Sequence, residues 1–249
     1  MKEGGIHISL GAHTLGTLFG IPITNTLVTS LVVMVILISL GVLIGKRLLL
    51  VPRGLQNAFE AIVEYIIAIM EETLESRKLA VRYFPLIMTI FLFILFSNMF
   101  DFLPIFGSIG FQEGGELIPL FHPVNADLNS TLSLAIIAFL VIELSGIFML
   151  GILKYGSKFV SIRSPMDFAI GLLEIIGNLA RLISFSFRLF GSIFAGEVLI
   201  LVVSTFVPYV VPVPIMLFEV LIGFLQAAIF ALLTLAFIKI AIAEPHGAH

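Results

Sequence analysis

The sequence predicts an all-α, polytopic transmembrane protein. Of its 249 residues, 59% are hydrophobic and only 12% are charged, and the mean hydropathy is +1.18. These values lie far outside the range of water-soluble globular domains. Long apolar stretches alternate with short segments that collect the basic residues or the prolines and glycines. We expect a single membrane domain over residues 1–249, with upright spans, an amphipathic surface helix and a long, strongly tilted helical hairpin at its C-terminal end.

The composition also excludes several kinds of site. Without cysteine there is no disulfide framework, thiolate metal site or cysteine nucleophile. His7, His13, His246 and His249 lie near the termini, and His122 stands beside a proline in a loop. The chain has no H-E-x-x-H motif, which argues against an intramembrane hydrolase. We therefore expect no metal and no cofactor.

The first predicted span covers residues 27–45. A helix of that length extends about 28 Å, which is enough to cross the hydrocarbon core of a bilayer. Lys46 and Arg47 follow the span, and no basic cluster precedes it. This charge pattern favours an anchor with an outer N-terminus over a cleaved signal peptide.

Residues 54–78 predict an amphipathic helix at the inner membrane surface. Apolar residues such as Phe59, Ile62 and Ile66 recur at helical spacing, and five glutamates interrupt them. The glutamates form either a solvated face, which we favour, or a docking surface for a peripheral partner.

The second predicted span covers residues 84–103. Asn98 and Asp101 lie one helical turn apart at its outer end and therefore share a face. They either line a polar path or make a capping or interfacial pair.

The third predicted span covers residues 130–153. The segment before it, 104–128, has no lysine or arginine, which is typical of an outer loop. We expect Asp127 or Asn129 to cap the span.

The basic residues predict the orientation of the chain. Lys2 precedes the first span, and most of the thirteen basic residues fall in segments that would then face the inner side. These are Lys46, Arg47, Arg53, Arg77, Lys78, Arg82, Lys154, Lys158 and Arg163. Lys239, near the end of the last apolar stretch, agrees with an inner C-terminus.

The C-terminal hairpin is predicted from residues 165–206 and 215–243, joined by a proline-rich outer turn. A helix over the first range would be about 60 Å long, twice the thickness of the hydrocarbon core. Either it is inclined well beyond the usual tilt of about 20°, or it kinks at Gly177 or Gly191. We favour the inclined helix, since neither glycine is joined by a proline.

Arg188 is the main functional candidate, because it interrupts an apolar run near the middle of the first helix of this hairpin. An arginine at the bilayer centre costs roughly 2.5 to 3.5 kcal/mol on insertion scales, so such a residue usually lines a polar path or faces a partner. The alternative is a side chain that reaches the membrane surface from a helix end, which the central position of Arg188 disfavours.

The other polar residues of the hairpin separate into two sets. Glu174, Arg181 and Arg188 step by seven and therefore share a helix face, as do Glu219 and Gln226. The inner set is Glu174, Arg181 and Ser184, and the outer set is Glu197 and Glu219 with Asn98 and Asp101. Two polar half-paths with a fixed cation between them are typical of a proton relay. A polar cluster that only joins helices is the alternative.

Four motifs resemble subunit a of the F-type ATP synthase. They are Arg188-Leu-Phe-Gly-x-x-x-Ala-Gly-Glu197, Phe224-Leu-Gln226-Ala, Asn98-x-x-Asp101-x-x-Pro104 and Ala126-Asp-x-Asn129-x-Thr131. The resemblance implies a non-catalytic stator subunit that conducts protons through two offset half-channels to and from the carboxylates of a rotating c-ring. It implies b-type peripheral stalk subunits and the rest of the ATP synthase as partners in a lipid bilayer, with no nucleic acid and no nucleotide site on this chain. The implied location is a bacterial inner membrane, with the C-terminus in the cytoplasm.

The same resemblance assigns roles to individual residues. It makes Arg188 the essential stator arginine, places Glu197 and Glu219 in the outer half-channel, and puts Gln226 near the arginine. Ser184 and Glu174 match inner half-channel positions. This sequence departs from the family at Ser192, where many members have asparagine, and at Glu219, where many have histidine.

A stand-alone secondary ion-coupled transporter is the main alternative. Such transporters commonly carry inverted repeats, and we find no convincing internal repeat here. The sequence leaves open whether the coupling ion is a proton or sodium.

Overall fold

The predicted all-α, polytopic class is confirmed. The computed structural model describes residues 12–18, 20–46, 55–102, 110–113, 116–156, 165–207 and 210–243. Within these ranges, five helices are long and apolar enough to cross a membrane. They are α1 (Asn25–Gly45), α3 (Arg77–Phe100), α4 (Leu128–Leu150), α6 (Pro165–Phe206) and α7 (Pro212–Ile242). Two further helices are α2 (Leu55–Leu74) and the short α5 (Ile152–Gly156).

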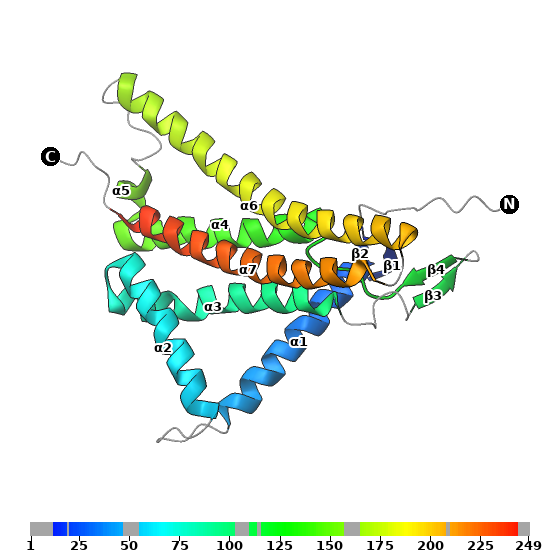
Figure 1. Cartoon of the computed structure of the whole chain (residues 1–249). Coiled ribbons are helices and arrows are strands. Elements are labelled where there is room, and N and C mark those ends of the chain that lie inside the picture. Colours follow the sequence, from blue (N-terminus) through cyan, green and yellow to red (C-terminus); the bar gives the residue numbers. More distant parts are fainter. Residues whose placement is uncertain are drawn as a thin grey trace. The chain divides into compact units, whose positions relative to one another are not determined.

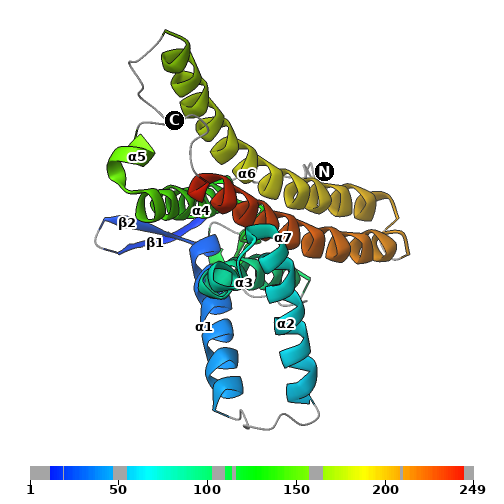
Figure 2. The ribbon, with the colours of Figure 1, turned by 90° about the vertical axis from the view of Figure 1, so that its left-hand side faces the viewer.

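Two short antiparallel strand pairs were not predicted. β1 (Thr14–Leu18) pairs with β2 (Ile21–Thr24), drawn as a narrow ribbon in Figure 2. β3 (Gly110–Glu113) pairs with β4 (Glu116–Pro119) inside the segment expected to be a loop. Strands this short carry too few alternating residues for periodicity to reveal them.

Some sequence expectations lie outside the described residues. These are the positions of Lys2, His7, Arg47, Arg53, Pro104, Lys158, Arg163, His246 and His249. The orientation of the chain therefore rests on its charge pattern and stays an expectation.

The helices divide between two compact units. The first unit is Met1–Leu40, Leu92–Thr131 and Phe187–Ala227, and the second is Gly41–Phe91, Leu132–Ser186 and Ala228–His249. Each of the five long helices contributes to both units.

In the first unit, the beginning of α1 holds the segment that precedes α4. Asn25, Thr26 and Thr29 are buried. The Thr26 hydroxyl donates to Asp127 Oδ2 at 3.0 Å, and Thr29 Oγ1 accepts from the His122 backbone N–H at 3.2 Å. Asp127 Oδ1 also accepts from the Asn129 backbone N–H at 2.9 Å, so the expected cap of α4 is confirmed.

In the second unit, a hydrophobic core joins the apolar face of α2 to three other helices. Met70 and Leu74 of α2 are buried with Tyr83 of α3, Ile142 of α4 and Leu235 of α7. Ile66 packs against this core, as the spacing predicts, whereas Phe59 and Ile62, nearer the start of α2, are exposed.

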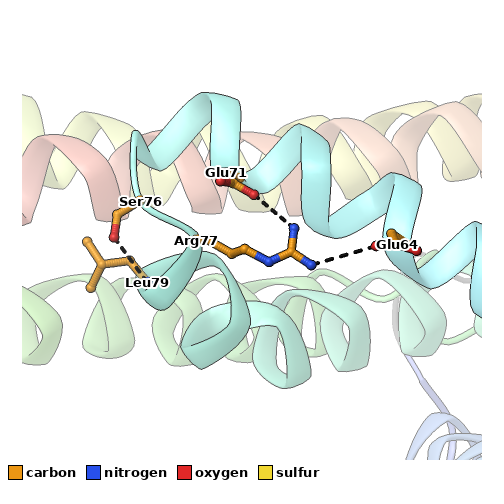
Figure 3. Close-up of polar contacts among 5 residues, drawn as sticks. All are labelled: Glu64, Glu71, Ser76, Arg77 and Leu79. Atoms are coloured by element: carbon orange, nitrogen blue, oxygen red, sulfur yellow. Dashed lines mark hydrogen bonds and ion pairs between the residues drawn. The ribbon is translucent and has the colours of Figure 1, made fainter.

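The turn between α2 and α3 explains why α2 ends at Leu74 while the prediction continued to residue 78. Glu75 has a φ of 55°, a left-handed conformation that ends a helix. Arg77 lies close to Glu71, with a nitrogen–oxygen distance of 3.1 Å, and to Glu64 at 3.7 Å (Figure 3). Ser76 Oγ accepts from the Leu79 backbone N–H at 3.5 Å, which starts the next helix at Arg77.

The first helix of the C-terminal hairpin is continuous. α6 has 42 residues from Pro165 to Phe206, so neither Gly177 nor Gly191 ends it. Figure 1 draws it as one coiled ribbon. α7 begins at Pro212, earlier than expected, because proline is tolerated in the first turn of a helix.

Candidate functional site

Three carboxylates of the first unit line one cavity of about 330 Å³. Asp101 follows the end of α3, Glu197 belongs to α6 and Glu219 to α7. Asn98 and His122 add polar groups to the wall, and the rest of the lining is apolar. The outer set predicted from the sequence therefore meets around one cavity. Among the described residues no cluster has the make-up of a metal site.

A glycine allows two of these carboxylates to come together. A Cβ atom built on Gly196 of α6 would lie 2.6 Å from Cδ of Glu219 and closer still to one of its carboxylate oxygens. The Glu219 carboxylate therefore rests on the α6 backbone at the residue before Glu197. Any larger residue at position 196 would push it away.

Asn98 ties α3 to two other parts of the first unit. It is 1% exposed, its amide donates to the Gly223 carbonyl of α7 at 2.9 Å, and it accepts from Asn125 Nδ2 at 2.7 Å. A Cβ on Gly223 would lie 3.0 Å from the Cβ of Asn98, so the two helices approach closely at this point. The interaction fixes the end of α3, from which Asp101 follows.

Several buried polar atoms beside these groups have no hydrogen-bond partner among the described residues. They are both carboxylate oxygens of Asp101, Ser97 Oγ, Asn125 Oδ1 and Gln226 Nε2. Buried polar atoms are normally paired, and exceptions in native proteins often mark water or functional groups.

Arg188 lies on an exposed face of α6, together with Ser184 and Phe187. Leu189, the next residue, is completely buried. One turn beyond Arg188, a Cβ on Gly191 would meet nothing within 4 Å. Gly191 and Gly196 of α6 therefore have different surroundings. Gly196 contacts the Glu219 carboxylate, whereas Gly191 faces open space. Ser192 is half-buried, and its hydroxyl donates to the Leu189 carbonyl at 3.1 Å.

In the second unit, the predicted inner residues Glu174 and Arg181 are in contact. Their side chains approach to 3.6 Å, and the Arg181 guanidinium lies 4.9 Å from the ring centre of Phe237 on α7. A cation over an aromatic face is favourable in partly desolvated surroundings. Ser184, the third inner residue, is exposed.

Sequence reasoning missed three residues that extend this inner cluster. Arg181 Nη1 donates to Asn178 Oδ1 at 2.6 Å, and Asn178 Nδ2 donates to Glu143 Oε1 at 3.1 Å. The Tyr155 hydroxyl donates to Glu143 Oε2 at 2.9 Å. Burial raises the pKa of the Tyr155 phenol, and the hydrogen bond to Glu143 raises it further. The signal that could have found Glu143 is its position as a carboxylate inside an apolar span.

His122 and Gly196 were also missed as parts of the outer cluster. His122 had been interpreted only as a loop residue, and a lone histidine beside a proline carries no signal of a cavity. In the sequence, Gly196 is only one glycine of the motif that ends at Glu197, and only the packing of α7 shows that it contacts the Glu219 carboxylate.

The fold defines a polytopic, all-α membrane protein with carboxylates inside its apolar helices, and comparison with known proteins identifies the family. Residues 27–239 match the family model described as "ATP synthase A chain". The protein belongs to the family of ATP synthase subunit a. It is therefore a multi-pass membrane component of the F-type ATP synthase, with a stator role in the membrane sector.

The curated relatives agree along most of the chain. "ATP synthase subunit a" of Campylobacter jejuni strain 81-176 is 36% identical over 83% of this chain and 84% of the relative. "ATP synthase subunit a 1" of Syntrophotalea carbinolica is 36% identical over 86% and 84%. The Campylobacter curvus subunit a is 36% identical over 86% of this chain and 89% of its own length.

Proposed function

We propose that this chain conducts protons through two offset half-channels to and from the carboxylates of a rotating c-ring. The observation that carries the proposal is the exposed position of Arg188 on α6, while the acidic residues divide between two separate clusters. One cluster belongs to each compact unit. An exposed guanidinium on an apolar helix is suited to meet a charged group of a neighbouring subunit.

The outer half-channel consists of Asp101, Glu197 and Glu219 with Asn98, around the cavity of the first unit. Glu197 and Glu219 pass the proton along this channel toward the rotor. Gln226, 6% exposed on α7, acts near Arg188, and Ser192 takes the place of the asparagine that many family members have. The inner half-channel consists of Glu174, Arg181 and Ser184.

Arg188 separates the two half-channels. A rotor carboxylate in lipid must be protonated, and it can lose its proton only beside a positive charge that favours the anion. Loading from the outer side and unloading to the inner side makes rotation directional. Each charge that crosses contributes about 2.3 kcal/mol per 100 mV of membrane potential.

The partners follow from this role. The c-ring faces Arg188, and b-type peripheral stalk subunits hold the chain against rotation. The expected location is a bacterial inner membrane, with the N-terminus outside and the C-terminus in the cytoplasm.

The replacement Arg188→Ala tests the proposal in the assembled complex in lipid vesicles. We expect proton-driven ATP synthesis to disappear while the subunit still co-purifies with the ring. Arg188→Lys should also fail, because a lysine that becomes buried against the ring in the assembled complex can deprotonate and lose its charge. Arg82→Ala, which removes an exposed arginine of α3, is the matched control and should retain synthesis. Coupled synthesis in the Arg188→Ala complex, or ion transport by the isolated chain in liposomes, would overturn the proposal.

A further inference from the structure

Glu143 of α4 lies in the second unit and belongs to no part of the proton path described above. It is joined to Arg181 through a single side chain, Asn178. We propose that Glu143 is a positioning residue of the inner half-channel, which orients the Asn178 amide and through it the Arg181 guanidinium that pairs with Glu174. This inference rests on the proposed function and deepens it.

The first argument is the cost of the carboxylate itself. Glu143 lies inside α4, a helix apolar enough to span a membrane. A carboxylate in such a segment is expensive and is usually satisfied by partners. Glu143 has one partner for each oxygen, with Tyr155 donating to Oε2 at 2.9 Å and Asn178 donating to Oε1 at 3.1 Å. Because both carboxylate oxygens have a partner, the Glu143 side chain has a fixed position in the second unit.

The second argument concerns the direction of the Asn178 amide. Glu143 Oε1 accepts from Asn178 Nδ2, so the amide turns its NH₂ group toward Glu143. Its oxygen then points the other way, where it accepts from Arg181 Nη1 at 2.6 Å. Asn178 is 6% exposed, so water cannot readily replace either contact. Arg181 has donors only and favours the same amide orientation from its side, so loss of the acceptor at position 143 removes the contact that fixes the NH₂ end of the amide.

The third argument is the way the unit accommodates Tyr155. A Cβ on Gly146 of α4 would lie 2.8 Å from Cζ of the Tyr155 ring, so the ring packs directly on that glycine. Gly146 comes one turn after Glu143 on the same helix, which brings the Tyr155 hydroxyl to the carboxylate. The raised pKa of the phenol keeps it protonated, so it acts as a donor over the working pH range.

In the inner half-channel, the Arg181 guanidinium therefore has three contacts. Arg181 contacts the oxygen of Asn178, the carboxylate of Glu174 at 3.6 Å and the ring of Phe237 at 4.9 Å. Glu174 and Phe237 both allow the guanidinium to shift, because one contact is long and the other is not directional. The short hydrogen bond to Asn178 therefore sets the position of the Arg181 guanidinium. Glu143 in turn sets the orientation of the Asn178 amide.

The test uses the assembled complex in vesicles and measures the rate of ATP-driven proton uptake. Glu143→Leu removes the acceptor and should lower the rate about threefold or more, within the range of coupling measured for networked residues. Glu143→Gln should recover most of the rate, because its amide oxygen can still accept from Asn178. Glu72→Leu, at an exposed glutamate of α2, is the matched control and should leave the rate unchanged.

A double-mutant cycle separates positioning from a general structural role. Asn178→Leu should cause the same loss as Glu143→Leu, and the double variant should be no worse than either one. If the complex with Glu143→Leu does not assemble, two other variants still test the network. They are Asn178→Leu and Tyr155→Phe, and the second of them keeps the aromatic ring on Gly146. The inference is overturned if Glu143→Leu or Asn178→Leu has the wild-type rate, if Glu143→Gln is as deficient as Glu143→Leu, or if the two losses add.

The two proposals fail in distinguishable ways. Retained coupling in Arg188→Ala would reject the half-channel function, whatever the result at Glu143. Loss of coupling in Arg188→Ala and Glu174→Gln, together with a wild-type rate in Glu143→Leu, would reject only the positioning role.

Discussion

The Glu219 carboxylate of α7 rests on the backbone of α6 at Gly196, where a side chain would collide with it. The contact places Glu219 beside Glu197, and both line the same cavity. The absence of a side chain at one residue thus determines where an acid of another helix lies.

Gly196→Ala should displace the Glu219 carboxylate and leave the fold in place. The added methyl meets the flexible end of a glutamate, so Glu219 can move and little overpacking remains. Since a misplacement of about 1 Å can cost as much as 10²-fold in rate, we expect roughly a tenfold or larger loss of proton conduction. The measurement is ATP-driven acidification of vesicles that contain the assembled complex.

Gly41→Ala on α1 is the control, because a Cβ there meets nothing within 4 Å. It should conduct at the normal rate. Normal conduction in Gly196→Ala would show that the position of Glu219 does not matter to the path.

Asn98→Ala should lower the stability of the first unit. The substitution leaves the Gly223 carbonyl and Asn125 Nδ2 without the partner they share. A buried polar group left unsatisfied costs about 1 to 3 kcal/mol, so the thermal midpoint of the purified complex should fall. Asn57→Ala on the exposed face of α2 should leave the midpoint unchanged. Equal midpoints for the two variants would contradict a tie between α3 and α7 through Asn98.

The pair of Glu75 and Lys239 should make a pH-dependent contribution to stability. A hydrogen bond from Lys239 at 2.8 Å, followed by its charge, lowers the pKa of Glu75 from the ordinary value of 4.5. A carboxyl whose pKa is lowered on folding stabilises the protein above that ordinary value, and the contribution disappears as the pH falls through the folded-state pKa. Both side chains are exposed, so the effect is small and is screened by salt.

The measurement is the difference in thermal midpoint between the wild type and Glu75→Gln at low ionic strength. The difference should favour the wild type at neutral pH and close on acidification below the ordinary glutamate range. Glu72→Gln, in the last turn of α2, serves as the control for the loss of a nearby glutamate. A difference that grows as the pH falls would contradict the proposed direction.

Local sequence patterns predicted the class of fold and the candidate residues of the path. Hydropathy indicated an all-α polytopic protein because a backbone in lipid must satisfy its own hydrogen bonds, which a helix does within one segment. The step of seven between Glu174 and Arg181 predicted a shared helix face, and the two side chains are in contact. Arg188 was identified by the cost of a charge in an apolar run.

The predictions failed where the deciding contact joins residues that are far apart in the chain. Asn98 and Gly223 are separated by 125 positions, and Asn178 and Glu143 by 35. The two strand pairs and the end of α2 at Leu74 were also not predicted. Each depends on the backbone conformation of a few residues, and a hydropathy average over a long window does not detect it.

The sequence by itself determined that the chain enters a membrane as helices and carries a cation in the middle of one of them. Only the tertiary structure decided which carboxylates meet, that Gly196 receives Glu219, and that Glu143 reaches Arg181 through Asn178. The physical reason is that helix formation depends on neighbours along the chain, whereas a hydrogen bond or a close approach between helices depends on how their surfaces fit together.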